Sequence, residues 1–419
     1  MLPRLLCGAA LVGASIGAAP PPAAAAPTGG AWTASGSIAF ELRWFPQSPA
    51  FAGQLDTRQP SGLLEPELRW RSADRRHQVD LAGFGRWDGG DGERSHLDLR
   101  EGSYRFVGDS FELLAGVSRV FWGVAESRHL IDAINQVDAV EDLDEEDRLG
   151  QPMVRLALDR DWGRLEVYSL IGFRERTFPG REGRLRPPLP VAERALYADD
   201  AGLDWALRWS RVAGDWDLAA HVFTGLGREP ELVPAASGAA FTPAASGGAL
   251  VPAAGGTALI PVYRAIDQAG VEVQYTVGAW LWKLEALARA GHGETFGAAV
   301  FGFERTFYQV GGSAADLGVL VEGLWDGRDA AAPPTIYDDD VFAGLRLALN
   351  DVQDTRLLAG AVIDRDDRSA LVLVEAARRL GHRLTLELEA RFFPGADPAS
   401  DLAAFERDGF VVLRAAWHW

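Results

Sequence analysis

An acidic run in the first half of the chain carries the densest set of side chains able to do chemistry. Six carboxylates lie close together between Val120 and Met153. Such oxygens are the ligands that Ca²⁺ prefers, and they also attract soluble cations. The run lacks the glycine and the regular ligand spacing of an EF-hand loop, so Ca²⁺ binding stays one interpretation among others and we assign no metal. The residues are Glu141, Asp142, Asp144, Glu145, Glu146 and Asp147.

The rest of the sequence offers no set of residues typical of an enzyme. It has no Gly-x-Ser-x-Gly elbow, no His-Glu-x-x-His pair and no P-loop. His129, His221 and His292 are scattered, and the only cysteine is Cys7. We therefore expect neither catalysis nor a cofactor.

Composition and the first residues limit the class of protein. The 419 residues carry a formal net charge of −18, which excludes nucleic acid as a partner because phosphates need a basic face. Residues 1–26 have the features of a cleaved signal peptide, with Arg4 before a short apolar segment and small residues at its end. Residues 27–419 then form a single domain. No later stretch approaches the roughly 18 apolar residues of a transmembrane helix.

The elements that must position the acidic run are strands, because the hydrophobic pattern has a period of two. In Trp32–Trp44, "WTASGSIAFELRW", apolar and small residues occupy one face and mainly polar residues the other. Trp stands at both ends of the apolar face, as expected where a strand crosses both interfaces of a bilayer. The same alternation recurs in "RLTLELEARFF" (383–393) and in the terminal "FVVLRAAWHW".

The repeated pattern predicts an all-β fold, a closed antiparallel transmembrane β-barrel of about eighteen strands, with sixteen as the alternative. Connections after even-numbered strands are tight, and most of those after odd-numbered strands are long. A break of phase in "REGSYRF" predicts a β-bulge. The predicted strands are 31–44, 62–72, 76–88, 95–106, 110–122, 151–160, 163–174, 200–212, 214–225, 264–278, 279–291, 295–309, 315–326, 340–350, 354–365, 368–378, 381–392 and 408–419.

Charged residues on the polar strand faces would line the inside of such a barrel. Their mixed signs would produce a transverse field that orders water and favours polar solutes. The predicted lumen charges are Glu41, Arg43, Glu67, Arg69, Arg208, Glu387, Glu389, Arg391 and Arg414.

The terminal strand ends on an aromatic residue and resembles the C-terminal signal of Gram-negative outer-membrane barrels. The matching residues are Val411, Leu413, Trp417 and Trp419, although those families more often end in Phe. The resemblance implies an outer-membrane location, recognition by the outer-membrane assembly machinery, and contact with the lipid bilayer and lipopolysaccharide. It also leaves a homo-oligomer open, since general porins are often trimers.

A second resemblance lies at the start of the long connection. Trp122, Gly123, Asp132, Asn135 and Asp138 are similar to a Trp-Gly…Asp-x-x-Asn-x-x-Asp segment of a poorly characterised proteobacterial outer-membrane barrel family. Because the function of that family is unsettled, the resemblance implies a barrel and no particular substrate. Helical spacing in 125–136 predicts a short helix in this loop.

Three interpretations of the loop 123–150 stay open. It folds into the lumen and narrows the pore, it forms a solvated cap, or its acidic run binds a divalent cation. The resulting functional hypothesis is an outer-membrane channel for passive passage of small polar solutes or ions. The alternatives are a gated or plugged barrel that moves lipids or hydrophobic molecules with a partner and, less favoured, a secreted soluble all-β protein.

Overall fold

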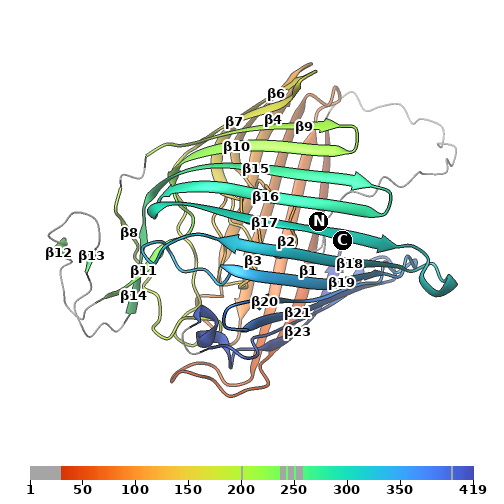
Figure 1. The fold of residues 1–419 in the computed structure, drawn as a ribbon. Coiled ribbons are helices and arrows are strands. Elements are labelled where there is room, and N and C mark those ends of the chain that lie inside the picture. The colour runs from red at the N-terminus through yellow and green to blue at the C-terminus, as the bar shows by residue number, and fades with distance from the viewer. Residues whose placement is uncertain (1–29, 200–201, 236–241, 244–249, 252–257, 398–399) are drawn as a thin grey trace.

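The segments of period two form one antiparallel sheet of eighteen strands, and pairing of the first strand with the last closes it into a barrel (Figure 1). This computed structural model describes residues 30–199, 202–235, 242–243, 250–251, 258–397 and 400–419. The predicted leader, residues 1–26, lies outside the described residues. The prediction of an all-β barrel with eighteen strands, rather than sixteen, is confirmed.

Each barrel strand pairs with its neighbours along the chain. At the seam, Phe40 of the first strand lies opposite Ala415 of the last. The barrel strands are β1 (Ala31–Trp44), β2 (Arg58–Arg71), β3 (His77–Asp88), β4 (Leu97–Val107), β5 (Phe111–Ser118), β6 (Gln151–Arg160), β7 (Gly163–Leu170), β9 (Asp204–Ala213), β10 (Trp216–Leu226), β15 (Ala265–Val277), β16 (Trp280–Gly291), β17 (Gly293–Phe307), β18 (Asp316–Asp326), β19 (Asp339–Ala348), β20 (Arg356–Asp364), β21 (Ala370–Leu380), β22 (Leu384–Phe392) and β23 (Phe410–His418).

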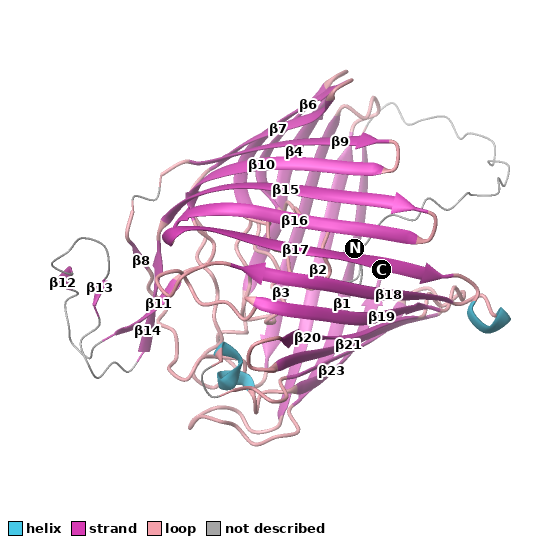
Figure 2. Ribbon diagram, viewed as in Figure 1, coloured by secondary structure: helices cyan, strands magenta, loops and turns pink. Residues whose placement is uncertain are grey.

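The remaining elements lie in the connections. The strands β8 (Leu196–Tyr197), β11 (Glu231–Ala235) and β14 (Ala258–Tyr263) form a small sheet, and β12 (Thr242–Pro243) pairs with β13 (Leu250–Val251). Two 3₁₀ turns are present, η1 (Val310–Gly312) and η2 (Asp401–Phe405) (Figure 2). Among the described residues, no helix is long and apolar enough to cross a membrane.

The two ends of the barrel differ in their connections. Tight links such as 72–76, 161–162 and 214–215 join strands at one end, which we call the turn end. Most long links lie at the other, which we call the loop end, together with β8, β11 and β14 (Figure 1). Short turns on one side and long loops on the other are the plan of bacterial outer-membrane barrels.

Along the barrel strands the apolar side chains are exposed and the charged ones are buried, the reverse of the pattern in a soluble β-sandwich. In β1, the apolar Phe40 and Trp44 are 58% and 47% exposed, whereas the charged Glu41 and Arg43 are 1% and 3% exposed. Large apolar side chains on the outside and enclosed charges on the inside suit a barrel with lipid around it and a polar lumen. The pattern disfavours the soluble alternative, because a water-exposed surface of this kind would aggregate.

The predicted bulge is present in β4. The register between β3 and β4 passes from Ala82 opposite Glu101 to Gly83 opposite Leu99, so Arg100 is the extra residue. A bulge re-aims the side chains around it. Here the guanidinium of Arg100 is buried and contacts Asp138 of the long loop.

The helix predicted within 125–136 does not form. The segment is irregular, with turns and bends only. Its backbone N–H groups find partners in carboxylates of distant strands, as described below, and a helix would have used the same donors internally. The apolar residues that gave the helical spacing pack into the barrel interior instead, and Leu130 and Ile134 are fully buried.

Candidate functional site

Residues 119–150 are here called the inner loop. Two inward-facing carboxylates of the barrel wall hold its first half. Glu285 on β16 accepts hydrogen bonds from the N–H groups of Val124 (2.5 Å) and Ala125 (2.7 Å) through Oε1. Glu322 on β18 accepts from the N–H groups of Glu126 (2.9 Å) and Ser127 (2.8 Å). These contacts place the loop against the inner wall, in the barrel interior.

The Trp-Gly pair at the start of the inner loop fits this docking. The indole of Trp122 is 1% exposed and packs edge-on against the ring of Tyr168 of β7, with 5.7 Å between centroids. Gly123 has a φ of +140°, and a Cβ there would lie 3.0 Å from Oε1 of Glu285. Glycine is thus the residue that permits both the backbone conformation and the close approach to the carboxylate.

Asn135 ties together the two ends of the inner loop. Its Oδ1 accepts from the N–H of Val120 (2.8 Å), and its Nδ2 donates to the carbonyls of Ser118 (3.0 Å) and Leu149 (2.8 Å). The side chain is 0% exposed, so its amide is a structural bridge. Asp132, also buried, lies 3.5 Å from Nε of Arg148 at the end of the same loop.

Asp138 anchors the inner loop to the opposite part of the barrel. Its Oδ2 contacts Nε2 of His96 (3.2 Å) and the guanidinium of Arg100, and its Oδ1 accepts from Oγ1 of Thr177 (2.5 Å). Burial opposes ionisation, but the contacts with His96 and Arg100 dominate and hold the pKa of Asp138 below its usual range.

The first carboxylates of the acidic run are neutralised by arginines of the early strands. Arg86 of β3 lies between Glu141 (2.5 Å) and Glu41 (2.9 Å), and Arg43 of β1 donates to Oδ2 of Asp142 (2.9 Å). These side chains are almost completely buried. Glu141 and Asp142 therefore fix the inner loop in place and add little net charge to a pore.

Of the later carboxylates of the run, Asp144 and Glu146 lie against the wall made by β20–β23. Asp144 contacts Arg391 of β22, with 2.6 Å between Oδ2 and Nη2, and Glu146 lies 3.9 Å from Nε2 of His129. Glu145 points to Arg176 (3.3 Å) on another connection. Burial raises the pKa of Asp144 to about 8, with the charges of Asp142 and Glu146 adding to the effect and Arg391 opposing it.

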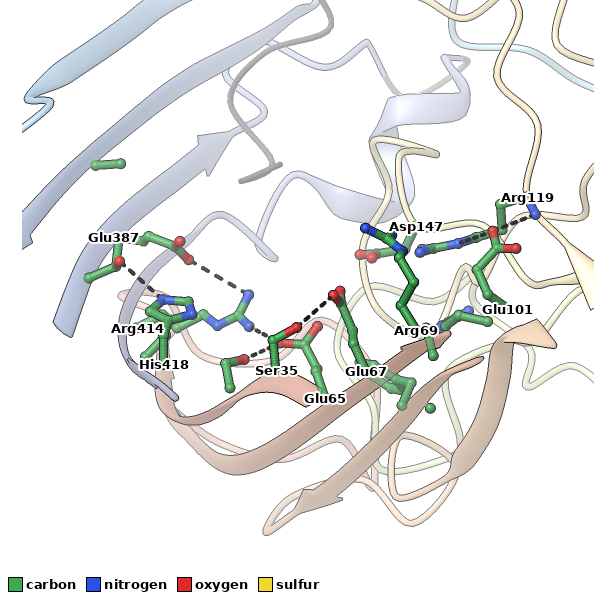
Figure 3. A pocket seen from close by; sticks show the side chains of 18 of the residues that line it. Ser35, Glu65, Glu67, Arg69, Glu101, Arg119, Asp147, Glu387, Arg414 and His418 are labelled. Atoms are coloured by element: carbon green, nitrogen blue, oxygen red, sulfur yellow. Dashed lines mark hydrogen bonds and ion pairs between the residues drawn. The ribbon is translucent and has the colours of Figure 1, made fainter. Parts of the chain in front are cut away.

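A cavity of about 810 Å³ opens at the turn end between β1–β4 and β20–β23. Figure 3 shows that charges of both signs line it: Arg414 lies between Glu65 (2.7 Å) and Glu387 (3.6 Å), and Ser35 donates to Glu67 (3.3 Å). Asp147 and Arg119 of the inner loop also border this cavity. Water and small polar solutes can enter a space of this size and polarity.

Two small cavities adjoin the large one along the wall made by β20–β23. The first, of about 30 Å³, shares Glu146, Glu387 and Arg414 with the large cavity. The second, of about 40 Å³, shares Asp144, Glu146 and Glu375 with the first and reaches Tyr337 towards the loop end. We call these two cavities the neck; each has room for only a few water molecules. Six carboxylates and one arginine line its first cavity: Glu41, Asp144, Glu146, Glu375, Glu387, Glu389 and Arg414.

The structure places the predicted lumen charges on the inner face, in two groups. Glu41, Arg43, Glu389 and Arg391 lie near the inner loop, and Glu67, Arg69, Glu387 and Arg414 line the cavity at the turn end. Arg208 stands apart and pairs with Glu272 of β15 (3.0 Å). Of the residues predicted as an assembly signal, Leu413, Trp417 and Trp419 are exposed, while Val411 is half-buried.

Sequence reasoning missed several residues that hold the inner loop or line the neck. Glu285 was recognisable in principle, because Lys283, Glu285 and Arg289 alternate with Leu284 and Ala286 in the same period of two, whereas the residues around Glu322 are apolar on both faces. Their partners were not recognisable, since the loop lies far away in sequence. The missed residues are Arg86, Arg94, Arg100, Glu285, Glu322 and Glu375.

Comparison with known proteins identifies the fold. No protein-family model matches the chain, and no curated protein does. Solved structures match almost its whole length. The chain superposes on OccK11 (OpdR) of Pseudomonas aeruginosa with a TM-score of 0.51 at 10% identity, covering 93% of this chain and 95% of that one. It has the fold of Gram-negative outer-membrane porins.

Two further structures support the same conclusion. OccAB1 of Acinetobacter baumannii matches with a TM-score of 0.51 at 8% identity, over 92% of this chain and 95% of that one. Wzi of Escherichia coli, an outer-membrane protein involved in group 1 capsule assembly and described as a carbohydrate-binding β-barrel, matches with a TM-score of 0.50 at 8% identity, over 90% and 83%. At this level of identity the likeness concerns the fold alone.

Proposed function

We propose that the chain is a passive channel of the Gram-negative outer membrane for small polar solutes and ions, with the inner loop as its constriction. Residues 1–26 direct export, and residues 27–419 form the barrel. One observation carries the proposal: the cavity at the turn end and the two cavities of the neck share lining residues in succession, so they follow one another along the wall. An eighteen-stranded barrel is wide enough for an aqueous path unless something fills it, and the inner loop fills part of it.

The neck determines which solutes pass. Six carboxylates and one arginine line its first cavity. Arginines behind the lining balance part of this charge, since Arg86 and Arg94 pair with Glu41 and Arg391 pairs with Asp144 and Glu389. The remaining excess of carboxylates gives a negative potential, which favours cations and repels anions. The lining of the larger cavity mixes both signs, so it admits polar solutes without strong selection. We therefore propose a preference for small cations, set by Asp144 and Glu146 of the inner loop and by Glu375 and Glu387 of the wall.

Single-channel recording in a planar bilayer tests this function. The refolded mature protein is expected to show small, stable conductance steps, and a KCl gradient is expected to give a reversal potential of the sign for cation preference. Glu375→Gln together with Glu387→Gln should weaken that preference, because both carboxylates line the neck. Asp159→Asn, at the tight turn between β6 and β7, is the matched control and should leave it unchanged.

The opposite result is also informative. A β-rich, heat-modifiable protein that inserts into the bilayer but passes no current would contradict the passive channel. That result would favour the alternative hypothesis, a gated barrel that opens only with a partner.

The selectivity is expected to depend on pH through Asp144. Its raised pKa, about 8, means that the carboxyl is mostly protonated at pH 6.5 and mostly ionised at pH 9. Ionisation adds one negative charge to the neck, so cation preference should increase as pH rises through this interval. The measurement is the reversal potential under a fixed KCl gradient at several pH values.

Asp144→Asn should reduce this increase, since the amide does not titrate. Glu145→Gln is the control, because Glu145 faces Arg176 and does not line the neck. If Asp144→Asn retains the pH dependence of the unmodified protein, another group is responsible and the assignment to Asp144 is wrong.

A further inference from the structure

Three carboxylates that do not line the neck converge at the loop end of β19 and β20. Asp338, Asp340 and Asp364 each offer one oxygen, and these oxygens lie within 4.8 Å of one another. Asp340 is directly opposite Asp364 in the β19–β20 ladder. Like charges in such a pair repel and destabilise the sheet. A cluster of this kind is common on protein surfaces, so its surroundings decide what it does.

No basic side chain in the described part of the chain forms an ion pair with any of the three. The arginines nearby are engaged elsewhere. Arg365 pairs with Asp339 (2.7 Å), and both Arg128 (3.0 Å) and Arg328 (2.8 Å) pair with Asp326. The negative charge of the cluster is thus not balanced by the protein residues that surround it.

Two buried oxygens at the cluster have no hydrogen-bond partner. They are Oδ2 of Asp340, a residue 3% exposed, and Oγ of Ser369, a residue 1% exposed. The N–H of Asp364 donates to the carbonyl of Ser369 (3.0 Å), so Asp340, Asp364 and Ser369 form one row across three strands. The next row, with Val341 and Ile363, is exposed on the outer face, which turns the row of Asp340 inward.

Leaving such buried oxygens without a partner is unfavourable, because they lose their hydrogen bonds to water and gain none in return. The row therefore turns the Ser369 hydroxyl and the Asp340 carboxylate, each with an unsatisfied oxygen, towards the same inner face as Asp364. No hydrogen-bond donor among the described residues reaches these two oxygens. A cation would satisfy them and would also balance the negative charge.

We propose that Asp338, Asp340 and Asp364, with the hydroxyl of Ser369, form a binding site for a divalent cation of the Ca²⁺ type. Ca²⁺ takes oxygen ligands at about 2.3–2.6 Å in flexible geometry, so ligands on opposite sides of the ion stand about 4.6–5.2 Å apart. Backbone carbonyls and water complete the shell.

The site would join two connections at the loop end. Asp338 ends the connection 327–338, and Ser369 ends the connection 365–369. An ion held between them links β18–β19 to β20–β21 next to the wall that carries the neck. Its expected effect is on stability, independent of whether the channel conducts.

Calorimetric titration of Ca²⁺ into the chelator-treated mature protein tests the site. Refolding from inclusion bodies into detergent removes lipopolysaccharide, which would bind Ca²⁺ itself. The unmodified protein is expected to show one saturable site and a higher unfolding temperature with CaCl₂ than with EDTA. Asp340→Asn should lose both, and Asp366→Asn, an exposed aspartate on the same connection, should keep both.

Stability measured without Ca²⁺ distinguishes a cation site from the alternative, in which the three carboxylates share a proton and bind no ion. In EDTA, Asp340→Asn should be at least as stable as the unmodified protein, because the substitution removes like-charge repulsion. The proposal would be overturned if Asp340→Asn were more stable in EDTA while the unmodified protein showed neither Ca²⁺ binding nor a higher unfolding temperature with CaCl₂. If Asp340→Asn does not fold, Asp364→Asn serves instead, and Ca²⁺ binding of unmodified strength in that variant would overturn it as well.

Discussion

Deletion of residues 125–147 is expected to raise the single-channel conductance several-fold and to move the selectivity from cations towards anions. The first effect follows because the inner loop occupies the lumen, and without it only the eighteen-stranded wall limits the aqueous path. The measurement is single-channel conductance of the variant, with Val124 and Arg148 joined by a short Gly/Ser linker, in the same bilayer and salt.

The change of selectivity has a separate cause. The deletion removes nine carboxylates and one arginine. Arg43, Arg86 and Arg100 on the inner wall would lose the partners Asp142, Glu141 and Asp138, and their charge would face the pore. The remaining positive potential attracts anions. The sign of the reversal potential in a KCl gradient reports this change.

A deletion of residues 236–257, nearly equal in length and in the connection between β10 and β15, is the matched control. It removes no charged residue and should leave conductance and selectivity close to those of the intact chain. Heat-modifiable migration on a gel should first show that both proteins are folded. If the 125–147 deletion then has the same conductance as the intact protein, the inner loop does not limit the flow of ions.

Glu41→Gln is expected to destabilise the barrel by about 3–5 kcal/mol, the usual cost of removing one partner from a buried ion network. Glu41 accepts from Arg86 and Arg94, each at 2.9 Å, and Arg94 also contacts Asp88 (2.9 Å). The side chains in these contacts are at most 2% exposed, so water cannot replace the lost charge. Chemical unfolding of the refolded protein in lipid vesicles, followed by tryptophan fluorescence, measures the change in the free energy of unfolding.

Two variants test the cause of this loss. Glu67→Gln alters a carboxylate of the same type that lines the open cavity at the turn end, and should cost less than about 1 kcal/mol. Adding Arg94→Met to Glu41→Gln removes one of the two cations that lose Glu41 as a partner. Asp88 loses Arg94 in the same variant, so the double change should cost less than the two single changes together without restoring full stability. A double variant as unstable as the sum of its single changes would mean that Glu41 acts through packing alone.

The barrel was predictable from sequence because its determinant is local. Alternation in segments such as Trp32–Trp44, and the contrast of tight and long connections, indicated the strand number and which face is polar. The bulge at Arg100 was visible as a break in the same pattern. Each of these signals needs only neighbouring residues and the period of a strand.

The inner loop was not predictable because its determinants are remote. The spacing of Leu130 and Ile134 suggested a helix, yet the backbone there is bound by Glu285 and Glu322 of strands much later in the chain. The acidic run showed its charge but not its partners: Asp142 is neutralised by Arg43, whereas Asp144 faces the neck. A single sequence does not contain these pairings in any local pattern.

The contacts of the inner loop also have a consequence for the order in which the molecule assembles. The loop binds β1 and β3 from the early part of the chain and β16, β18 and β22 from the late part, and its contact with Arg391 spans 247 positions along the chain. Contacts between such distant segments form slowly, since the chain between them must be ordered first. A nascent sheet that ends before β16 offers the loop only half of its anchors. The barrel therefore acquires its narrow passage late in folding, close to the moment when the wall closes.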